Sequence, residues 1–303
     1  MRMLSHYHTA IDPGGENNSH ASMLRMVGFN KRVLETGCAS GHMSEELRAQ
    51  GCQVVGVEVD AAVAEAATPW LERLVVGDVE SDVLWGQLDG DSFDAILFGD
   101  VLEHLKDPLR ALRSAVKHLN PAGVVVISVP NIAHADVKFA LMRGTFPYAE
   151  SGLLDRTHIH FLTKESLLDL LREAGLVAVE LQRVTVPIFE TEIGVDRGGA
   201  SDEVVGALTD DRESLTYQFV VKAVRDDGAR ALDELSADMV ALTDQLVDAR
   251  KRIEILSHEL AVLQGQHEWD EGEIARLKRQ TNAVKKLIPP PLRRILGKRF
   301  STA

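Results

Sequence analysis

Cysteine is scarce in this sequence: Cys38 and Cys52 are the two thiols among 303 residues. Two thiols exclude a disulfide-stapled secreted fold, so a reducing, cytoplasmic compartment is expected. No run of about 18 apolar residues appears, which argues against a membrane-spanning helix. The first residues, MRMLSHYHTAIDPGG, contain no apolar core, and we do not expect them to act as a secretory signal.

Basic charge is also scarce, with 33 Lys and Arg residues against 46 Asp and Glu residues and a formal net charge of −13. Nucleic-acid binding requires clustered basic side chains to neutralise phosphates, so we expect no nucleic-acid partner. The exception is the C-terminal segment, which carries nine Lys and Arg residues and no acidic residue from Arg276 onward.

Three regions follow from the pattern of apolar residues. Residues 1–225 alternate short runs rich in Val, Ile and Leu with amphipathic segments, which predicts an α/β, doubly wound, mostly parallel sheet with helices on both faces. Residues 229–286 are expected to form one long helix, and residues 287–303 begin with a proline cluster that must end it. The predicted strands are 32–36, 53–58, 73–77, 93–98, 123–129, 176–184 and 215–224, with a helix at 163–174.

The most specific motif is VLETGCASG, residues 33–41. A buried strand ends at Glu35, and the small residues Gly37, Ala39 and Gly41 then let the backbone turn tightly against a ligand at the start of a helix. The spacing differs from the G-x-G-x-x-G of dinucleotide sites. Glu35 would repel a diphosphate and would favour a cationic sulfonium with an ammonium group.

Acidic residues follow four consecutive predicted strands: Glu35, Glu58, Asp78 and Asp100. Glu58 lies about 20 residues after the turn, where a carboxylate accepts hydrogen bonds from ribose hydroxyls. Acids at strand ends are often helix caps, but the ordered set of four favours one ligand site at the carboxyl edge of the sheet.

These motifs resemble the class I S-adenosylmethionine-dependent methyltransferases over residues 1–225, with Ala39 in place of a more usual glycine. The resemblance implies a seven-stranded sheet with the last strand antiparallel. It also implies a cofactor, S-adenosylmethionine, and a product, S-adenosylhomocysteine. The implied contacts are Glu35, Gly37 and Gly41 with the methionine part, Glu58 with ribose, Asp78 and Val79 with adenine, and Asp100 near the methionine end.

A narrower resemblance covers residues 16–20, 128–134 and 152–163, which look like a bacterial group of methyltransferases associated with polysaccharide synthesis. It implies O-methylation of a sugar or polysaccharide precursor. Alternatives are a quinone precursor, a lipid or a protein as acceptor, or a non-catalytic sensor of the cofactor in which the long helix is the working part.

Methylation of a hydroxyl requires removal of its proton, and DRTHIH at 155–160 offers the best candidates in a segment expected to cover the substrate mouth. His158 is the predicted base, with His104 and His134 as rivals. If the segment is extended, Asp155, Thr157 and Ile159 lie on one side, and Arg156, His158 and His160 on the other. Arg156 could orient a substrate oxygen or pair with Asp155.

Several residues in this region are suitable metal ligands, and a divalent ion could activate adjacent sugar hydroxyls. No zinc-type spacing is present, so a metal is possible here but is not predicted. These residues are Glu103, His104, Asp155, His158 and His160. Near the N-terminus, Tyr7, Asn18 and His20 are candidates for a lid over the cofactor, or for an ordinary polar surface.

The long predicted helix carries a heptad seam in which eleven of thirteen positions are apolar, from Leu235 to Leu277. This pattern predicts a coiled coil that joins copies of the chain in a homo-oligomer, and the alternative is a helix folded back on the first domain. The tail PPPLRRILGKRF pairs apolar with basic residues, which fits an anionic membrane surface at the inner face of the membrane or an acidic partner such as a glycosyltransferase.

Overall fold

The structure is a computed structural model that describes residues 15, 17–198, 200–226, 230–265, 275–276, 278–280 and 282–283. The chain divides into two compact units, Met1–Ser236 and Ala237–Ala303, and each is described by itself. None of the helices within the described ranges is long and apolar enough to span a membrane.

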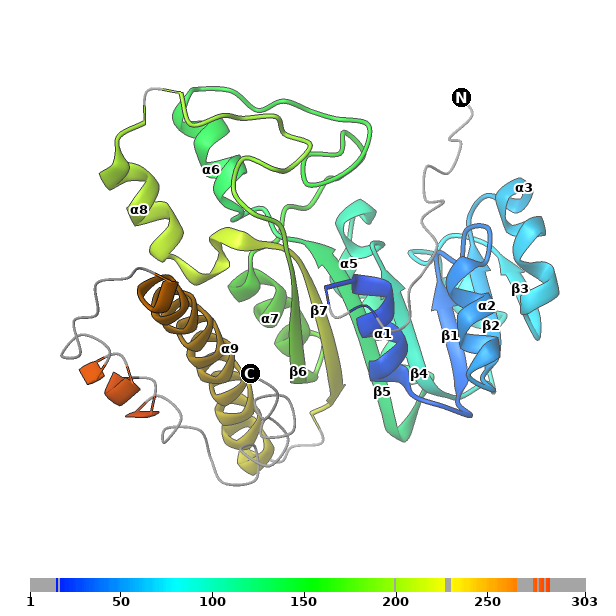
Figure 1. The fold of residues 1–303 in the computed structure, drawn as a ribbon. Helices are drawn as coiled ribbons and strands as arrows, with labels where there is room; N and C mark the ends of the chain where they lie inside the picture. Colours follow the sequence, from blue (N-terminus) through cyan, green and yellow to red (C-terminus); the bar gives the residue numbers. More distant parts are fainter. Residues whose placement is uncertain are drawn as a thin grey trace. The chain divides into compact units, whose positions relative to one another are not determined.

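Seven strands form one sheet in the order β3-β2-β1-β4-β5-β7-β6 (Figure 1). All neighbouring pairs are parallel except those of β7, which lies antiparallel to both β5 and β6. The predicted sheet and its antiparallel last strand are therefore confirmed. The strands are β1 Arg32–Thr36, β2 Gln53–Glu58, β3 Arg73–Val76, β4 Phe93–Gly99, β5 Leu119–Pro130, β6 Leu176–Thr185 and β7 Thr216–Arg225.

Helices cover both faces of the sheet because successive strand residues point to opposite faces. Val33 packs with the side chains of α1, α2 and the 3₁₀ helix η1, whereas its neighbour Leu34 packs with those of α4, α5 and α7. The helices that precede α6 are α1 Ser19–Val27, α2 His42–Ala49, α3 Ala61–Ala64, η1 Glu65–Trp70, α4 Asp82–Gly86, η2 Leu102–His104 and α5 Pro108–Lys117. They are followed by α6 Ala135–Met142, α7 Lys164–Glu173, α8 Asp202–Asp210 and η3 Arg212–Leu215.

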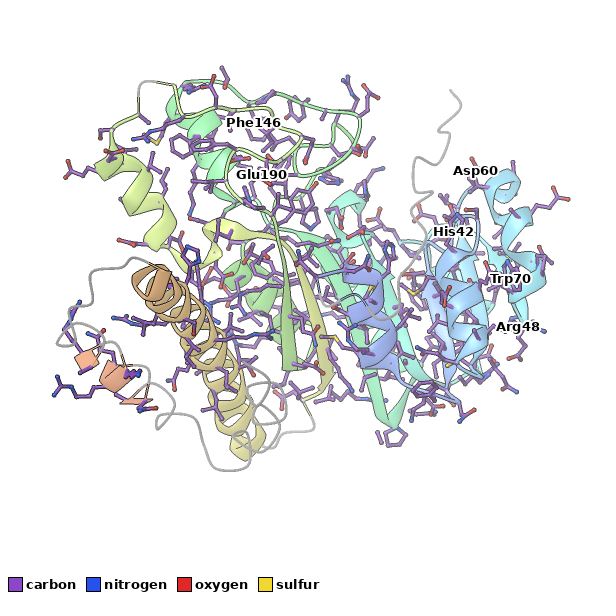
Figure 2. All side chains as sticks on the ribbon, viewed as in Figure 1. His42, Arg48, Asp60, Trp70, Phe146 and Glu190 are labelled. Atoms are coloured by element: carbon purple, nitrogen blue, oxygen red, sulfur yellow. The ribbon has the colours of Figure 1, made fainter. Side chains whose placement is uncertain are left out.

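Two long connections pack together into what we call the cap, which consists of residues 131–162, 186–198 and 200–215. Its small apolar core contains Val137, Leu153 and Leu154, against which Phe146 and Phe161 pack. Figure 2 labels Phe146 and Glu190, one in each connection. An insertion after the fifth strand was predicted, but the second connection and its helix α8 were not.

Buried polar side chains join the two connections of the cap. Asn131 donates to the carbonyl oxygens of Glu213 and Thr216. Asp136 is fully buried and accepts hydrogen bonds from the backbone N–H groups of Phe189 and Thr191. These bonds fix the loop after β6 against α6.

The last helix described in full is α9, Arg230–Gly265. Its 36 residues extend over about 54 Å. Residues 230–265 of the predicted 229–286 are helical. Residues 229, 266–274, 277, 281 and 284–286 lie outside the described residues, as does the whole tail 287–303.

Candidate active site

The loop between β1 and α2 forms the tight turn that the glycine-rich motif predicts. Gly37, Ala39 and Gly41 all have positive φ angles, of 65°, 45° and 89°. A Cβ atom on Gly41 would lie 2.7 Å from the Cα of Ala67, so the turn has no room for a side chain there. Ala39 adopts the left-handed conformation although it carries a Cβ atom.

Glu35 lies at the end of β1 beneath this turn and is 5% exposed. Its carboxylate accepts a hydrogen bond from the hydroxyl of Ser44 in α2. Burial raises the pKa of Glu35 to about 7, although the bond from Ser44 acts in the opposite direction. A carboxyl group with a pKa of about 7 therefore lies at the point where the sequence predicts a cationic ligand.

Glu58 ends β2 and reaches the same turn. One carboxylate oxygen accepts the N–H of Ala39 at 3.1 Å, and the other accepts the N–H groups of Val59 and Asp60 at 2.9 and 3.0 Å. The turn and the second acid, 19 residues apart in sequence, are therefore in direct contact. Figure 2 labels His42 and Asp60, which mark the starts of α2 and α3 beside this contact.

The third and fourth acids follow β3 and β4. Asp78 is exposed and accepts the N–H of Glu80, while Val79 beside it is 8% exposed. Asp100 has a positive φ of 53°, and its Oδ1 accepts hydrogen bonds from Ser128 of β5 and Gln218 of β7. The fixed backbone and these two donors orient the carboxylate at the edge of the sheet.

The four acids do not serve as helix caps. The N-cap residues of α2, α3, α4 and α5 are Gly41, Asp60, Ser81 and Asp107. The common structural explanation for acids at strand ends therefore does not account for Glu35, Glu58, Asp78 and Asp100, and a ligand site at this edge becomes the better explanation.

A second group of side chains lies where η2 meets the cap. One ligand atom each from Glu103, His104 and His158 lies within 4.8 Å of the other two. The rings of His104 and His158 contact each other edge to face, with centroids 4.7 Å apart. The backbone N–H groups of Ile159 and His160 donate to the carbonyl of Glu103, which fixes the cap segment on η2.

The segment 155–158 is a turn and not the extended run that alternation suggested. The N–H of His158 donates to the carbonyl of Asp155 at 3.1 Å, so residues three apart face the same way. Asp155 and His158 are both 7% exposed, whereas Arg156 and Thr157 are exposed. The predicted separation of Asp155 from His158 is therefore wrong, because periodicity of two applies only to extended backbone.

Residues 18–181 match the sequence model of a family described as "Methyltransferase domain". The chain belongs to this family. A ubiquinone biosynthesis O-methyltransferase of Ruegeria pomeroyi is 30% identical over 164 residues, which are 49% of this chain and 61% of that protein. One of the same description from Coxiella burnetii is 30% identical over 173 residues, covering 48% of this chain and 74% of that protein.

A solved methyltransferase structure from Archaeoglobus fulgidus, described as SAM-dependent, has a TM-score of 0.50 at 19% identity and covers 69% of this chain and 94% of that one. This likeness concerns the fold. The family match and this fold together identify a methyltransferase domain.

Electrostatics connects the two parts of the methyltransferase site. Glu103 is 1% exposed, and burial followed by the charge of Asp100 raises its pKa well above the usual range. Burial and the neighbouring His104 lower the pKa of His158, while Asp155 and Asp100 act against this. Asp100 therefore lies close enough to influence both groups.

Other candidate residues have structural roles. His134 is fully buried and caps α6: its Nδ1 accepts the N–H of Asp136, and its Nε2 lies 3.0 Å from the carbonyl of Val186. Both ring nitrogens are occupied, so the rival base at this position is ruled out. Asn18 caps α1, and Arg156 pairs with Glu150 rather than with Asp155. Tyr7 lies outside the described residues.

The sequence did not identify the side chains that orient the acids, namely Ser44, Ser128 and Gln218. Gln218 lies opposite Pro130 because β7 inserts beside β5. No local motif marks such a residue, since its position depends on strand order.

Proposed function

We propose that this chain transfers the methyl group of S-adenosylmethionine to a hydroxyl oxygen of a small acceptor. The observation that carries the proposal is the set of four strand-end acids, free of capping roles, around a tight turn where a Cβ on Gly41 would have no room. The cofactor supplies an activated methyl group, and the chain binds and orients it.

The residues fit the parts of the cofactor as follows. Glu58 has the position and charge to accept ribose hydroxyls, and Asp78 and Val79 lie where the adenine ring would be held. Glu35 and Asp100 flank the turn on the side where the ammonium and sulfonium groups would be stabilised by negative charge. Val79 offers a buried apolar surface beside the exposed carboxylate of Asp78.

An oxygen acceptor is supported by the side chains that could take its proton. His158 and His104 lie beside Asp155 and Asp100, and a neutral imidazole in this position can act as a general base. Two relatives whose names describe an O-methyltransferase add to this support.

The acceptor class has two candidates. The named relatives favour a phenolic hydroxyl of the kind that a quinone precursor carries. A sugar hydroxyl, the first prediction from the sequence, depends on the resemblance of residues 16–20, 128–134 and 152–163 alone. A screen for methyl transfer should therefore contain both catechols and nucleotide sugars.

Calorimetric titration with S-adenosylmethionine tests the proposal directly. We expect micromolar binding to the full chain and a loss of about 100-fold for Glu58→Ala, because hydrogen bonds to a charged group contribute about 1.5–3 kcal/mol each. Glu72→Ala, which removes an exposed carboxylate that pairs with Arg32 away from the turn, is the matched control and should bind normally.

Failure of the folded chain to bind the cofactor would overturn the proposal. Binding without methyl transfer to any acceptor would instead favour the alternative of a cofactor sensor built on the long helix.

A further inference from the structure

Two side chains beside the proposed acceptor site have buried polar atoms without a hydrogen-bond partner among the described residues. Neither carboxylate oxygen of Glu103 has a hydrogen-bond partner among the described residues, although the side chain is 1% exposed. The Nδ1 atom of His158 is likewise buried and unpartnered within the described part of the chain. Burial of a polar group without a hydrogen-bond partner costs free energy, so we expect these atoms to bind a ligand.

We propose that Glu103, His104 and His158 form a binding site for one divalent transition-metal ion of the Zn²⁺ type. The three ligand atoms lie within 4.8 Å of one another. Two imidazoles and one carboxylate are a ligand set that binds such ions and leaves at least one coordination position open.

Hydrogen bonds to the Nδ1 atom of His104 leave its Nε2 atom free to bind a metal. The Nδ1 atom lies 3.3 Å from the carbonyl and 3.2 Å from the hydroxyl of Thr157. That hydroxyl has one proton, which it donates to Asp155 at 2.6 Å. Nδ1 must therefore donate its own proton to the Thr157 carbonyl, which leaves Nε2 with a lone pair.

His158 offers its Nδ1 atom to the same place. This nitrogen is buried and has no hydrogen-bond partner among the described residues, and the ring contacts that of His104 edge to face at 4.7 Å between centroids. The backbone N–H of His158 donates to the carbonyl of Asp155, which fixes the residue in its turn.

The surrounding charge also favours a cation. Asp100 and Asp155 both act electrostatically on Glu103, so three carboxyl groups lie near one another without a nearby basic side chain in the contacts described. Asp155 and Asp100 are already held by Thr157 and by Ser128 and Gln218, and we assign them to support rather than to coordination.

The position gives the ion a role that rests on the proposed function. A hydroxyl that coordinated a divalent ion would have a lowered pKa and would lose its proton to water, after which its oxygen would take the methyl group from the sulfonium and S-adenosylhomocysteine would leave. In that case His104 and His158 act as ligands and not as bases.

Metal binding by the untagged full chain tests the site without reference to activity. After removal of metal with a chelator, we expect one equivalent of Zn²⁺ to bind in calorimetry and one equivalent of Co²⁺ to give visible absorption bands of a low-coordinate nitrogen and oxygen site. Glu103→Gln and His158→Ala should weaken binding by more than about 100-fold, beyond the 10- to 100-fold effect of losing a supporting partner.

His160→Ala is the matched control, since His160 belongs to the same segment and contacts the carbonyl of Lys106 instead of the cluster. The temperature of the thermal unfolding transition, measured in the presence of chelator, shows whether each variant is folded. In chelator, Glu103→Gln should unfold at a temperature no lower than that of the original chain, because the substitution removes an unpaired buried carboxyl group. Added Zn²⁺ should raise the transition of the original chain and not that of Glu103→Gln.

Absence of Zn²⁺ and Co²⁺ binding in the folded chain would overturn the inference, as would equal binding by Glu103→Gln. Cofactor titration is independent of this result. A folded chain that binds S-adenosylmethionine but neither Zn²⁺ nor Co²⁺ would contradict the metal site alone. A folded chain that binds the metal ion but not S-adenosylmethionine would contradict the proposed function alone.

Discussion

Glu35 illustrates how the environment of one residue controls its charge. The side chain is buried at the end of β1, and its pKa is raised to about 7 mainly by burial. A neutral carboxyl group does not attract a cation, whereas the ionised form does. The protonation of this residue should therefore be coupled to binding of a cationic cofactor.

We expect the affinity for S-adenosylmethionine to rise with pH through about 7. Below this pKa the bound cation must displace the proton of Glu35, so affinity should improve about fivefold between pH 6 and pH 7, about tenfold between pH 6 and pH 8, and little above pH 8. Calorimetry at these pH values measures the effect. Glu35→Gln should bind more weakly and remove this part of the pH dependence, while titration of the ligand itself is common to both proteins.

Ser44→Ala sharpens this test. The Ser44 hydroxyl lowers the pKa of Glu35, so its removal should move the rise in affinity to higher pH. A pH profile that is identical for Glu35→Gln and the original chain would contradict the assignment of Glu35 to the cationic end of the cofactor.

The site residues that could be identified from the sequence share one property: each lies at or directly after the end of a strand in the sequence. Glu35, Glu58, Asp78 and Asp100 could be found because the ends of parallel strands meet at one edge. Glu103 and His158 were recognised as suitable ligand types, but 55 residues separate them, and only the turn at 155–158 brings them together.

At the scale of the elements, the strands were predictable because their apolar runs are short and bounded by turn residues. The helix at Lys164–Glu173 was also found close to its true bounds. The helices α6 and α8 were not predicted: both lie in the cap and pack on its small core or at its surface, so they lack the strong apolar stripe that identifies a helix on a sheet.

Asp136 in α6 holds the two connections of the cap together. Its two oxygens accept the N–H groups of Phe189 and Thr191 and the hydroxyl of Thr191, and Phe189 has a positive φ of 68°. Asp136→Ala leaves these buried donors without a partner, which should lower the free energy of unfolding by about 2–4 kcal/mol. Urea denaturation measures this change.

Local opening should accompany that loss, and hydrogen exchange of residues 186–194 should increase in Asp136→Ala. Asp196→Ala is the control, because Asp196 pairs with Arg143 from an exposed position in the same loop and should have little effect on either measurement. Unchanged exchange in Asp136→Ala would show that the loop is held by other contacts.

At the scale of the whole molecule, the heptad seam of α9 is the feature through which we expect copies of the chain to associate. Leu242 belongs to the heptad seam and is 38% exposed, and Val247 lies off the seam and is 46% exposed. We propose, as the heptad pattern predicts, that copies of the chain associate through this seam.

Leu242→Asp should weaken this association at least 100-fold, because a charge buried without a partner costs about 3 kcal/mol or more. Light scattering over a range of concentrations gives the mass of the assembly. Val247→Asp introduces the same charge off the seam and should leave the mass unchanged. A monomeric original chain, or equal effects of both substitutions, would contradict the coiled coil.

The position of β7 between β5 and β6 has a consequence for how the chain acquires its fold during synthesis. β7 is the last strand to leave the ribosome, yet its hydrogen bonds join two strands made long before it. Until residue 225 has emerged, the facing edges of β5 and β6 have no partner, and the nascent chain exposes strand edges that invite aggregation. Completion of the sheet is therefore a late, long-range event. Variants that slow it are expected to lower the yield of folded protein through aggregation, even where the stability of the folded domain is unchanged.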